Sequence, residues 1–224
     1  MKRLMKQIIK KTPLYYSLNQ WAVKRKRAKE LIEWEKNGKP LPPPHIVKQR
    51  TLQTYSKKFG LKILVETGTY YGGMVEAMKK IFDHIYSIEL SKELYEQAKK
   101  RFKGVKKIEL ICGDSGIELR NIMNKIDRPA LFWLDGHYSG GVTAKGEKDT
   151  PIYEELHHIL NASDRGHVII IDDARNFGSD PAYPSIEALK DFIKSKRPNL
   201  EIVVQDDSIR ITPTRYNQKL WIVL

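Results

Sequence analysis

From His45 onward, the hydrophobic positions alternate between short continuous runs and segments in which apolar residues recur every three or four positions. The runs predict buried strands, and the second spacing predicts amphipathic helices. Such an alternation is typical of an α/β fold with an open, doubly wound, mostly parallel sheet. Strands are expected at 62–66, 84–89, 107–112, 130–134 and 167–171, with an antiparallel edge from 200–205, 208–212 and 220–224. Helices are expected at 45–58, 73–82, 92–102, 115–126, 152–160 and 185–195.

Residues 1–36 combine clustered basic positions with spaced apolar ones, which predicts one or two amphipathic helices, the first interrupted by Pro13. The stretch NGKPLPPP at 37–44 predicts a stiff linker. We therefore expect a basic helical extension and Pro-rich linker at 1–44 and one α/β domain at 45–224. The extension could attach to an anionic membrane surface or a partner, or it could pack on the domain as a helical cap.

The net charge of +13 is concentrated at the amino end. Residues 1–50 contain 14 Lys or Arg against 3 Glu, which leaves 26 basic and 24 acidic residues for the nearly neutral remainder. No stretch approaches the roughly 20 apolar residues of a spanning helix. The single Cys112, expected to be buried, excludes an intrachain disulfide framework. These features predict a cytoplasmic protein whose basic segment can contact the inner face of the membrane, and they leave an oligomer open.

A glycine-bearing turn follows the first expected strand, in the sequence KILVETGTYYGG at 62–73. Gly68 allows a positive φ or a close approach of two backbones. Gly72 and Gly73 let a ligand lie against the start of the next helix, where amides lack partners. The turn predicts a site for a polar or anionic cofactor.

Every expected parallel strand ends near a carboxylate, and in such sheets ligands bind beyond these ends. Glu89 follows the glycine turn by about 20 residues, where a carboxylate can accept hydrogen bonds from both hydroxyls of a ribose. A nicotinamide dinucleotide turn has glycines spaced GxGxxG, whereas Tyr70 occupies the second of these positions. A cofactor that contains adenosine without a pyrophosphate is therefore favoured. The strand-end carboxylates are Glu66, Glu89, Asp114, Asp135, Asp172 and Asp173.

The order of these motifs resembles the class I methyltransferases that use S-adenosylmethionine. The resemblance covers roughly 62–173 and includes the ExGxxxG turn, the acidic end of the second strand, the GDS after the third and the LDG after the fourth. It implies a seven-stranded Rossmann-like methyltransferase fold. It also implies that Glu66 and Gly68 contact the methionine part, Glu89 the ribose, and Asp114 with Ser115 the adenine edge. The implied cofactor-binding residues are Glu66, Thr67, Gly68, Tyr70, Gly72, Glu89, Asp114, Ser115 and Asp135.

Within that family, the segments ETGTYYGG, LDGHYSGG and IDDAR look most like small-molecule O-methyltransferases, including those that modify sugars. Some of these hold Mg²⁺, and the resemblance places Asp135, Asp172 and Asp173 at the ligand positions. Such an ion favours oxygen ligands and could lower the pKa of a bound sugar hydroxyl. Alternatively, Asp172 or Asp173 caps the following segment.

His137 is the expected general base, because histidine exchanges protons near neutral pH and would lie beside the methyl donor. Asp135 is the rival base, or it orients the substrate for in-line transfer. The glycine-rich connection 138–151 contains Lys145 and Lys148 and could close over a polar or anionic acceptor, or it is a surface loop with solvated lysines. These residues predict O-methylation of a small-molecule or glycan-type hydroxyl.

Two other classes of function stay open at this point. A nucleic-acid-binding protein or an RNA methyltransferase would use the basic amino-terminal segment to contact phosphates. A nucleobase nitrogen is a less favoured target, because the Asn/Asp-Pro-Pro-aromatic motif of base-amino methyltransferases is missing. A catalytically idle cofactor-binding scaffold is the second class.

Overall fold

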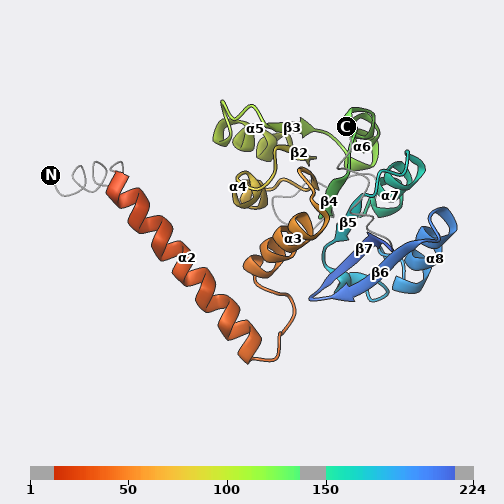
Figure 1. The fold of residues 1–224 in the computed structure, drawn as a ribbon, viewed down its shortest axis with the longest axis horizontal. Helices are drawn as coiled ribbons and strands as arrows, with labels where there is room; N and C mark the ends of the chain where they lie inside the picture. Colours follow the sequence, from red (N-terminus) through yellow and green to blue (C-terminus); the bar gives the residue numbers. More distant parts are fainter. Residues whose placement is uncertain (1–12, 137–149, 215–224) are drawn as a thin grey trace. The chain divides into compact units, whose positions relative to one another are not determined.

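The computed structural model describes residues 13–136 and 150–214, with side chains from residue 25 onward (Figure 1). The chain divides into two compact units, 1–50 and 51–224. This division falls inside helix α3 (His45–Phe59), a few residues beyond the boundary expected near residue 44. The strand expected at 220–224 lies outside the described residues.

The first unit is built on helix α2 (Pro13–Lys36) and the start of α3. Proline suits the first turn of a helix, where its missing N–H would have no partner in any case. After α2 the chain reverses, and Trp34 Nε1 donates a hydrogen bond to the carbonyl of Pro40 at 2.8 Å. Leu31, Trp34 and Val47 form a small buried cluster. Residues 25–29, four of them basic, are exposed. Among the described helices, none is long and apolar enough to cross a membrane.

The second unit contains a seven-stranded sheet in the order β3-β2-β1-β4-β5-β7-β6. The first five strands are parallel, and β7 runs antiparallel to both β5 and β6. This confirms the predicted mostly parallel sheet with an antiparallel edge. The strands are β1 (Ile63–Thr67), β2 (His84–Glu89), β3 (Ile108–Cys112), β4 (Ala130–Leu134), β5 (Val168–Ile171), β6 (Leu200–Gln205) and β7 (Ser208–Pro213).

Successive strand residues point to opposite faces of the sheet. Both faces are apolar here, and helices cover both of them. Leu64 belongs to a core that includes residues of α3, α4 and α5, whereas Val65 belongs to a core that includes residues of α6, α7 and α8. A short 3₁₀ helix, η1, follows β5. The helices of this unit are α4 (Gly73–Met78), α5 (Lys92–Arg101), α6 (Ser115–Lys125), η1 (Ala174–Asn176), α7 (Ile152–Asn161) and α8 (Ile186–Lys196), with α3 entering from the first unit.

Two local expectations were wrong. Helix α4 ends at Met78 instead of Phe82, because the chain must turn back toward β2, and Asp83 N–H already donates to the carbonyl of Lys62 at 2.8 Å. Cys112 is exposed instead of buried. It ends β3, the outermost parallel strand, which is only partly covered along its length.

Candidate cofactor and metal site at the strand ends

The glycine turn is held between its two neighbouring strands at the carboxyl end of β1. Gly68 and Thr69 N–H groups donate to the carbonyl of Ile88 at the end of β2, at 3.0 and 3.1 Å. On the other side, a Cβ added to Gly68 would lie 2.4 Å from the carbonyl oxygen of Asp135. Gly68 also has a φ of +83°. Both its left-handed backbone and the close approach of the Asp135 carbonyl therefore favour glycine at this position. Ligands bind in such folds where the strand order reverses, which here is at β1.

Glu66 lies buried beneath this turn. Its side chain is 2 % exposed, and its Oε2 accepts a hydrogen bond from Ser87 Oγ at 2.5 Å. Ser87 Oγ also lies 2.6 Å from Thr69 Oγ1, so two hydroxyls connect the carboxyl group to the turn. Burial raises the pKa of Glu66 to about 8, although the hydrogen bond from Ser87 opposes this, and the neighbouring Glu89 carboxylate raises it further. Glu66 is therefore mostly neutral at pH 7.

Glu89 ends β2 and fixes the outer part of the same turn. Its Oε2 accepts from Tyr70 N–H at 2.7 Å, and its Oε1 accepts from Ser91 N–H at 2.9 Å. Each carboxylate oxygen keeps a second lone pair, so Glu89 can still accept hydrogen bonds from a ligand. Tyr70 has a φ of 50°, and both Tyr70 and Tyr71 are about half exposed, with their rings packed edge to face.

Gly136, which follows β4, lies against the last residue of β1 and the first residue of α6. A Cβ added to this glycine would lie 3.0 Å from Thr67 Oγ1 and 3.1 Å from Ser115 Oγ. Asp114 begins α6 as its N-cap, because Asp114 Oδ1 accepts from Gly116 N–H at 2.8 Å. Thr67 Oγ1 accepts from Asp135 N–H at 3.1 Å. The structure thus brings the residues expected to bind the cofactor to one edge of the sheet.

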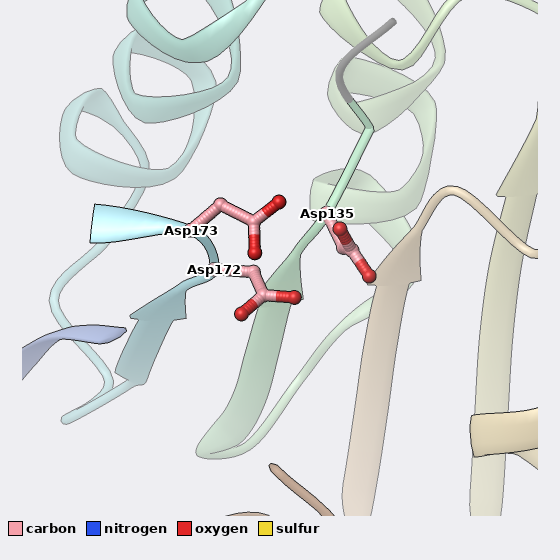
Figure 2. Close-up of side chains that lie close together, drawn as sticks. All are labelled: Asp135, Asp172 and Asp173. Atoms are coloured by element: carbon pink, nitrogen blue, oxygen red, sulfur yellow. The ribbon is translucent and has the colours of Figure 1, made fainter. Parts of the chain in front are cut away.

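Asp135, Asp172 and Asp173 project from the ends of β4 and β5 toward one another (Figure 2). Carboxylate oxygens of the three lie within 4.8 Å of one another. Asp172 and Asp173 are buried, and Asp173 has a left-handed backbone with φ at 54°. This set of hard oxygen donors fits a divalent cation such as Mg²⁺.

Arg175 lies beside this cluster and partly neutralises it. Its Nη1 donates to Asp173 Oδ1 at 2.9 Å and to Asp207 Oδ2, while its backbone N–H donates to Asp207 Oδ1 at 2.9 Å. Asp173 does not cap η1 through its side chain. The backbone N–H of Asp172 donates to the carbonyl of Leu134 at 3.0 Å, which ties β5 to β4 at the site.

A pocket opens next to Asp172, between the strand ends and the start of α7. Phe177 and Tyr183 face it from the segment after η1, and Glu155 faces it from α7. Burial raises the pKa of Tyr183 above its ordinary value, with smaller contributions from nearby carboxylates. The sequence pattern does not single out these three residues. Glu155 carried a weak signal, a carboxylate within the apolar stripe of its helix, whereas Phe177 and Tyr183 belong to an irregular segment without periodicity. His137 and residues 138–149 lie outside the described residues.

Known proteins resemble this chain in structure but not detectably in sequence: a scan against protein-family models and a search of curated proteins found no match. Solved structures with a similar fold include the O-methyltransferase from Bacillus cereus in complex with S-adenosylhomocysteine, with a TM-score of 0.55 and 16 % identity, over 84 % of this chain and 90 % of that one. The O-methyltransferase TomG from Streptomyces achromogenes, involved in tomaymycin synthesis and in complex with S-adenosylmethionine, has a TM-score of 0.52 and 16 % identity, over 84 % and 89 %. A candidate rRNA methylase from Clostridium thermocellum has 0.51 and 14 %, over 72 % and 93 %. The chain therefore has the Rossmann-like methyltransferase fold.

Proposed function

We propose that the protein is an S-adenosylmethionine-dependent methyltransferase. The observation that carries this proposal is the arrangement at the strand ends, in a fold shared with proteins that were crystallised with this donor or its product. The glycine turn presses against Asp135, and Glu89 stands at the end of β2 with accepting capacity left. The donor then lies across the ends of β1, β2 and β3, with its ribose at Glu89 and its adenine near Asp114 and Ser115.

Thermal unfolding tests the donor. At 100 times its Kd, a ligand that binds only the folded state stabilises it by about 2.7 kcal/mol. For a domain of this size, that corresponds to a rise in Tm of roughly 5–10 °C. We expect this rise with S-adenosylhomocysteine and no rise with NAD⁺. The reverse pattern would contradict the proposal and favour a dinucleotide enzyme.

We further propose that the acceptor is a hydroxyl group of a small molecule or glycan. The support is the likeness in fold to two O-methyltransferases, together with the cluster of Asp135, Asp172 and Asp173 beside the glycine turn, where an ion could bind next to an acceptor hydroxyl. Methyl transfer is an in-line displacement, so the residues of the chain must align the acceptor oxygen with the donor. Asp135 stands between the donor turn and the pocket and is the proposed orienting residue. His137 is the proposed base.

Asp135, Asp172 and Asp173 would hold Mg²⁺, which when bound would lower the pKa of the acceptor hydroxyl. Arg175 keeps the Asp173 carboxylate in place through its ion pair. Incubation with candidate acceptors in the presence of S-adenosylmethionine and Mg²⁺, followed by mass spectrometry, tests this part. We expect the mass of one methyl group to appear on a hydroxyl-bearing acceptor and not on RNA.

The second candidate is an RNA methyltransferase, which the exposed basic residues of α2 and the similarity to the candidate rRNA methylase favour. Phosphate contacts make binding strongly dependent on salt. The combined substitutions Arg25→Glu, Lys26→Glu and Lys29→Glu would then abolish salt-dependent binding of RNA. If the same variant instead loses binding to anionic vesicles, the basic residues of α2 bind the membrane surface, as proposed for a cytoplasmic protein with a basic extension.

A further inference from the structure

Glu66, Ser87 and Thr69 form a continuous hydrogen-bonded row beneath the glycine turn. The oxygen atoms are separated by 2.5 Å and 2.6 Å, and all three side chains are at most 2 % exposed. Glu66 and Ser87 lie opposite each other in the parallel pairing of β1 with β2. The row therefore rests on the two strands nearest to the donor site.

The surroundings of Glu66 favour its neutral form. The charged group that acts on it is Glu89, a carboxylate on β2. On the other side, β4 presents Trp133 opposite Glu66, and the first charged residue after that strand is Asp135. Helix α4 packs Met74, Val75 and Met78 into the core on this side of the sheet, while its Glu76 is half-buried and pairs with Lys79 and Arg101. A buried carboxylate among apolar and negative groups is costly, so it holds a proton.

The row satisfies Glu66 in either protonation state. When Glu66 is neutral, it donates to Ser87 Oγ, and Ser87 donates to Thr69 Oγ1. When Glu66 is ionised, Ser87 donates to it and Thr69 donates to Ser87. Hydroxyl groups both donate and accept, and they change direction by rotating their hydrogens, so no heavy atom has to move. The row can thus take a proton or release one without loss of a hydrogen bond.

We propose that binding of the donor is coupled to release of the proton of Glu66, with Ser87 and Thr69 as positioning residues that reverse their hydrogen bonds. This rests on the proposed function, because the methionine part of the donor supplies the cationic ammonium group. A positive charge within a few ångströms favours the carboxylate. The O–H bond of Glu66 breaks, the proton passes to the buffer, and a carboxylate–ammonium pair replaces the neutral acid.

Isothermal titration calorimetry of the full chain with S-adenosylhomocysteine, in two buffers of different ionisation enthalpy, tests the coupling. Because the pKa of free Glu66 is about 8, we expect release of about 0.9 proton per ligand at pH 7. Adenosine lacks the ammonium group and should bind without release. The matched control is Glu66→Gln, whose amide resembles the neutral acid and cannot release a proton. Relative to this variant, wild-type affinity should rise roughly 20-fold between pH 6 and pH 7.5.

Ser87→Ala separates positioning from structure. Loss of the hydroxyl that favours the carboxylate should move the bend of the affinity profile to higher pH, whereas a purely structural role would lower affinity equally at every pH. An equal loss at every pH would remove Ser87 from the proposal. Tight binding of S-adenosylhomocysteine without proton release would overturn the coupling and leave the proposed function standing. Absence of binding by both ligands would overturn the proposed function, and the coupling with it.

Discussion

The substitution Gly68→Ala tests whether the glycine turn is held against the end of β4. The added Cβ would lie 2.4 Å from the carbonyl oxygen of Asp135 and 3.0 Å from its carbonyl carbon. Both are backbone atoms, and the N–H of Asp135 donates a hydrogen bond to Thr67 Oγ1. A shift of the Asp135 backbone would therefore strain or break this hydrogen bond. A methyl group there must therefore displace either the turn or the start of the segment that follows β4.

The expected loss of stability has two parts. A left-handed backbone costs an alanine about 1–2 kcal/mol relative to glycine. Forcing an extra methyl group into a packed site adds about 1–3 kcal/mol. At roughly 2–4 °C per kcal/mol for a chain of this size, the Tm should fall by about 4–20 °C.

Gly104→Ala is the matched control. Gly104 has a φ of +84°, almost equal to that of Gly68, but an added Cβ would meet nothing within 4 Å. This variant should show the backbone cost alone, so the difference between the two variants measures the contact with Asp135. Thermal unfolding followed by circular dichroism gives both Tm values, and calorimetry with S-adenosylhomocysteine should show weakened binding for Gly68→Ala alone. Equal losses of Tm in the two variants would refute the close approach.

Three further outcomes are expected. In Glu89→Gln only one of the two side-chain acceptors remains, so the backbone N–H of either Tyr70 or Ser91 faces an NH₂ group. Unfolding by denaturant should show that the free energy of unfolding falls by about 1–2 kcal/mol. An unchanged free energy of unfolding would contradict the two hydrogen bonds to Glu89. Burial lowers the pKa of His167 to about 4, so as the pH falls the unfolded state takes up a proton on this side chain before the folded state does. The stabilising contribution of neutral His167 is complete above pH 6.5 and is lost as the pH falls to 4, which should lower the free energy of unfolding by about 3 kcal/mol. His167→Asn should flatten that part of the pH profile of unfolding, and an unchanged profile would exclude His167 as its source. Addition of MgCl₂ should raise the Tm of the wild type but not that of Asp172→Asn, and an equal rise in both would exclude Asp172 as a ligand.

The central strands β1, β4 and β5 could be predicted because each contains a continuous apolar run that stops at a polar residue. Ile63–Val65 stops at Glu66, and Leu131–Leu134 stops at Asp135. Once the strands are parallel, these stops fall on the same edge of the sheet, which brings the expected cofactor residues together. The exposure of Cys112 could not be predicted in this way, because strand order, not local sequence, places β3 at the outside.

Contacts between distant residues account for the rest of the site. Ser87 is an ordinary strand residue in the sequence, and only the pairing of β1 with β2 places its hydroxyl on Glu66. Arg175 and Asp207 are 32 positions apart, and their ion pair depends on β7 lying next to β5. The sequence pattern marked where charged side chains would gather but contained no signal for the partners that set their protonation and orientation.

A crystal structure of the protein with S-adenosylhomocysteine bound tests the central claim most directly. The account predicts the ribose hydroxyls on the Glu89 carboxylate, the adenine beside Asp114 and Ser115, and the methionine part over Gly68 above Glu66. Density for the ligand at another place on the molecule, or none at saturating concentration, would contradict the assignment of these strand ends as the donor site.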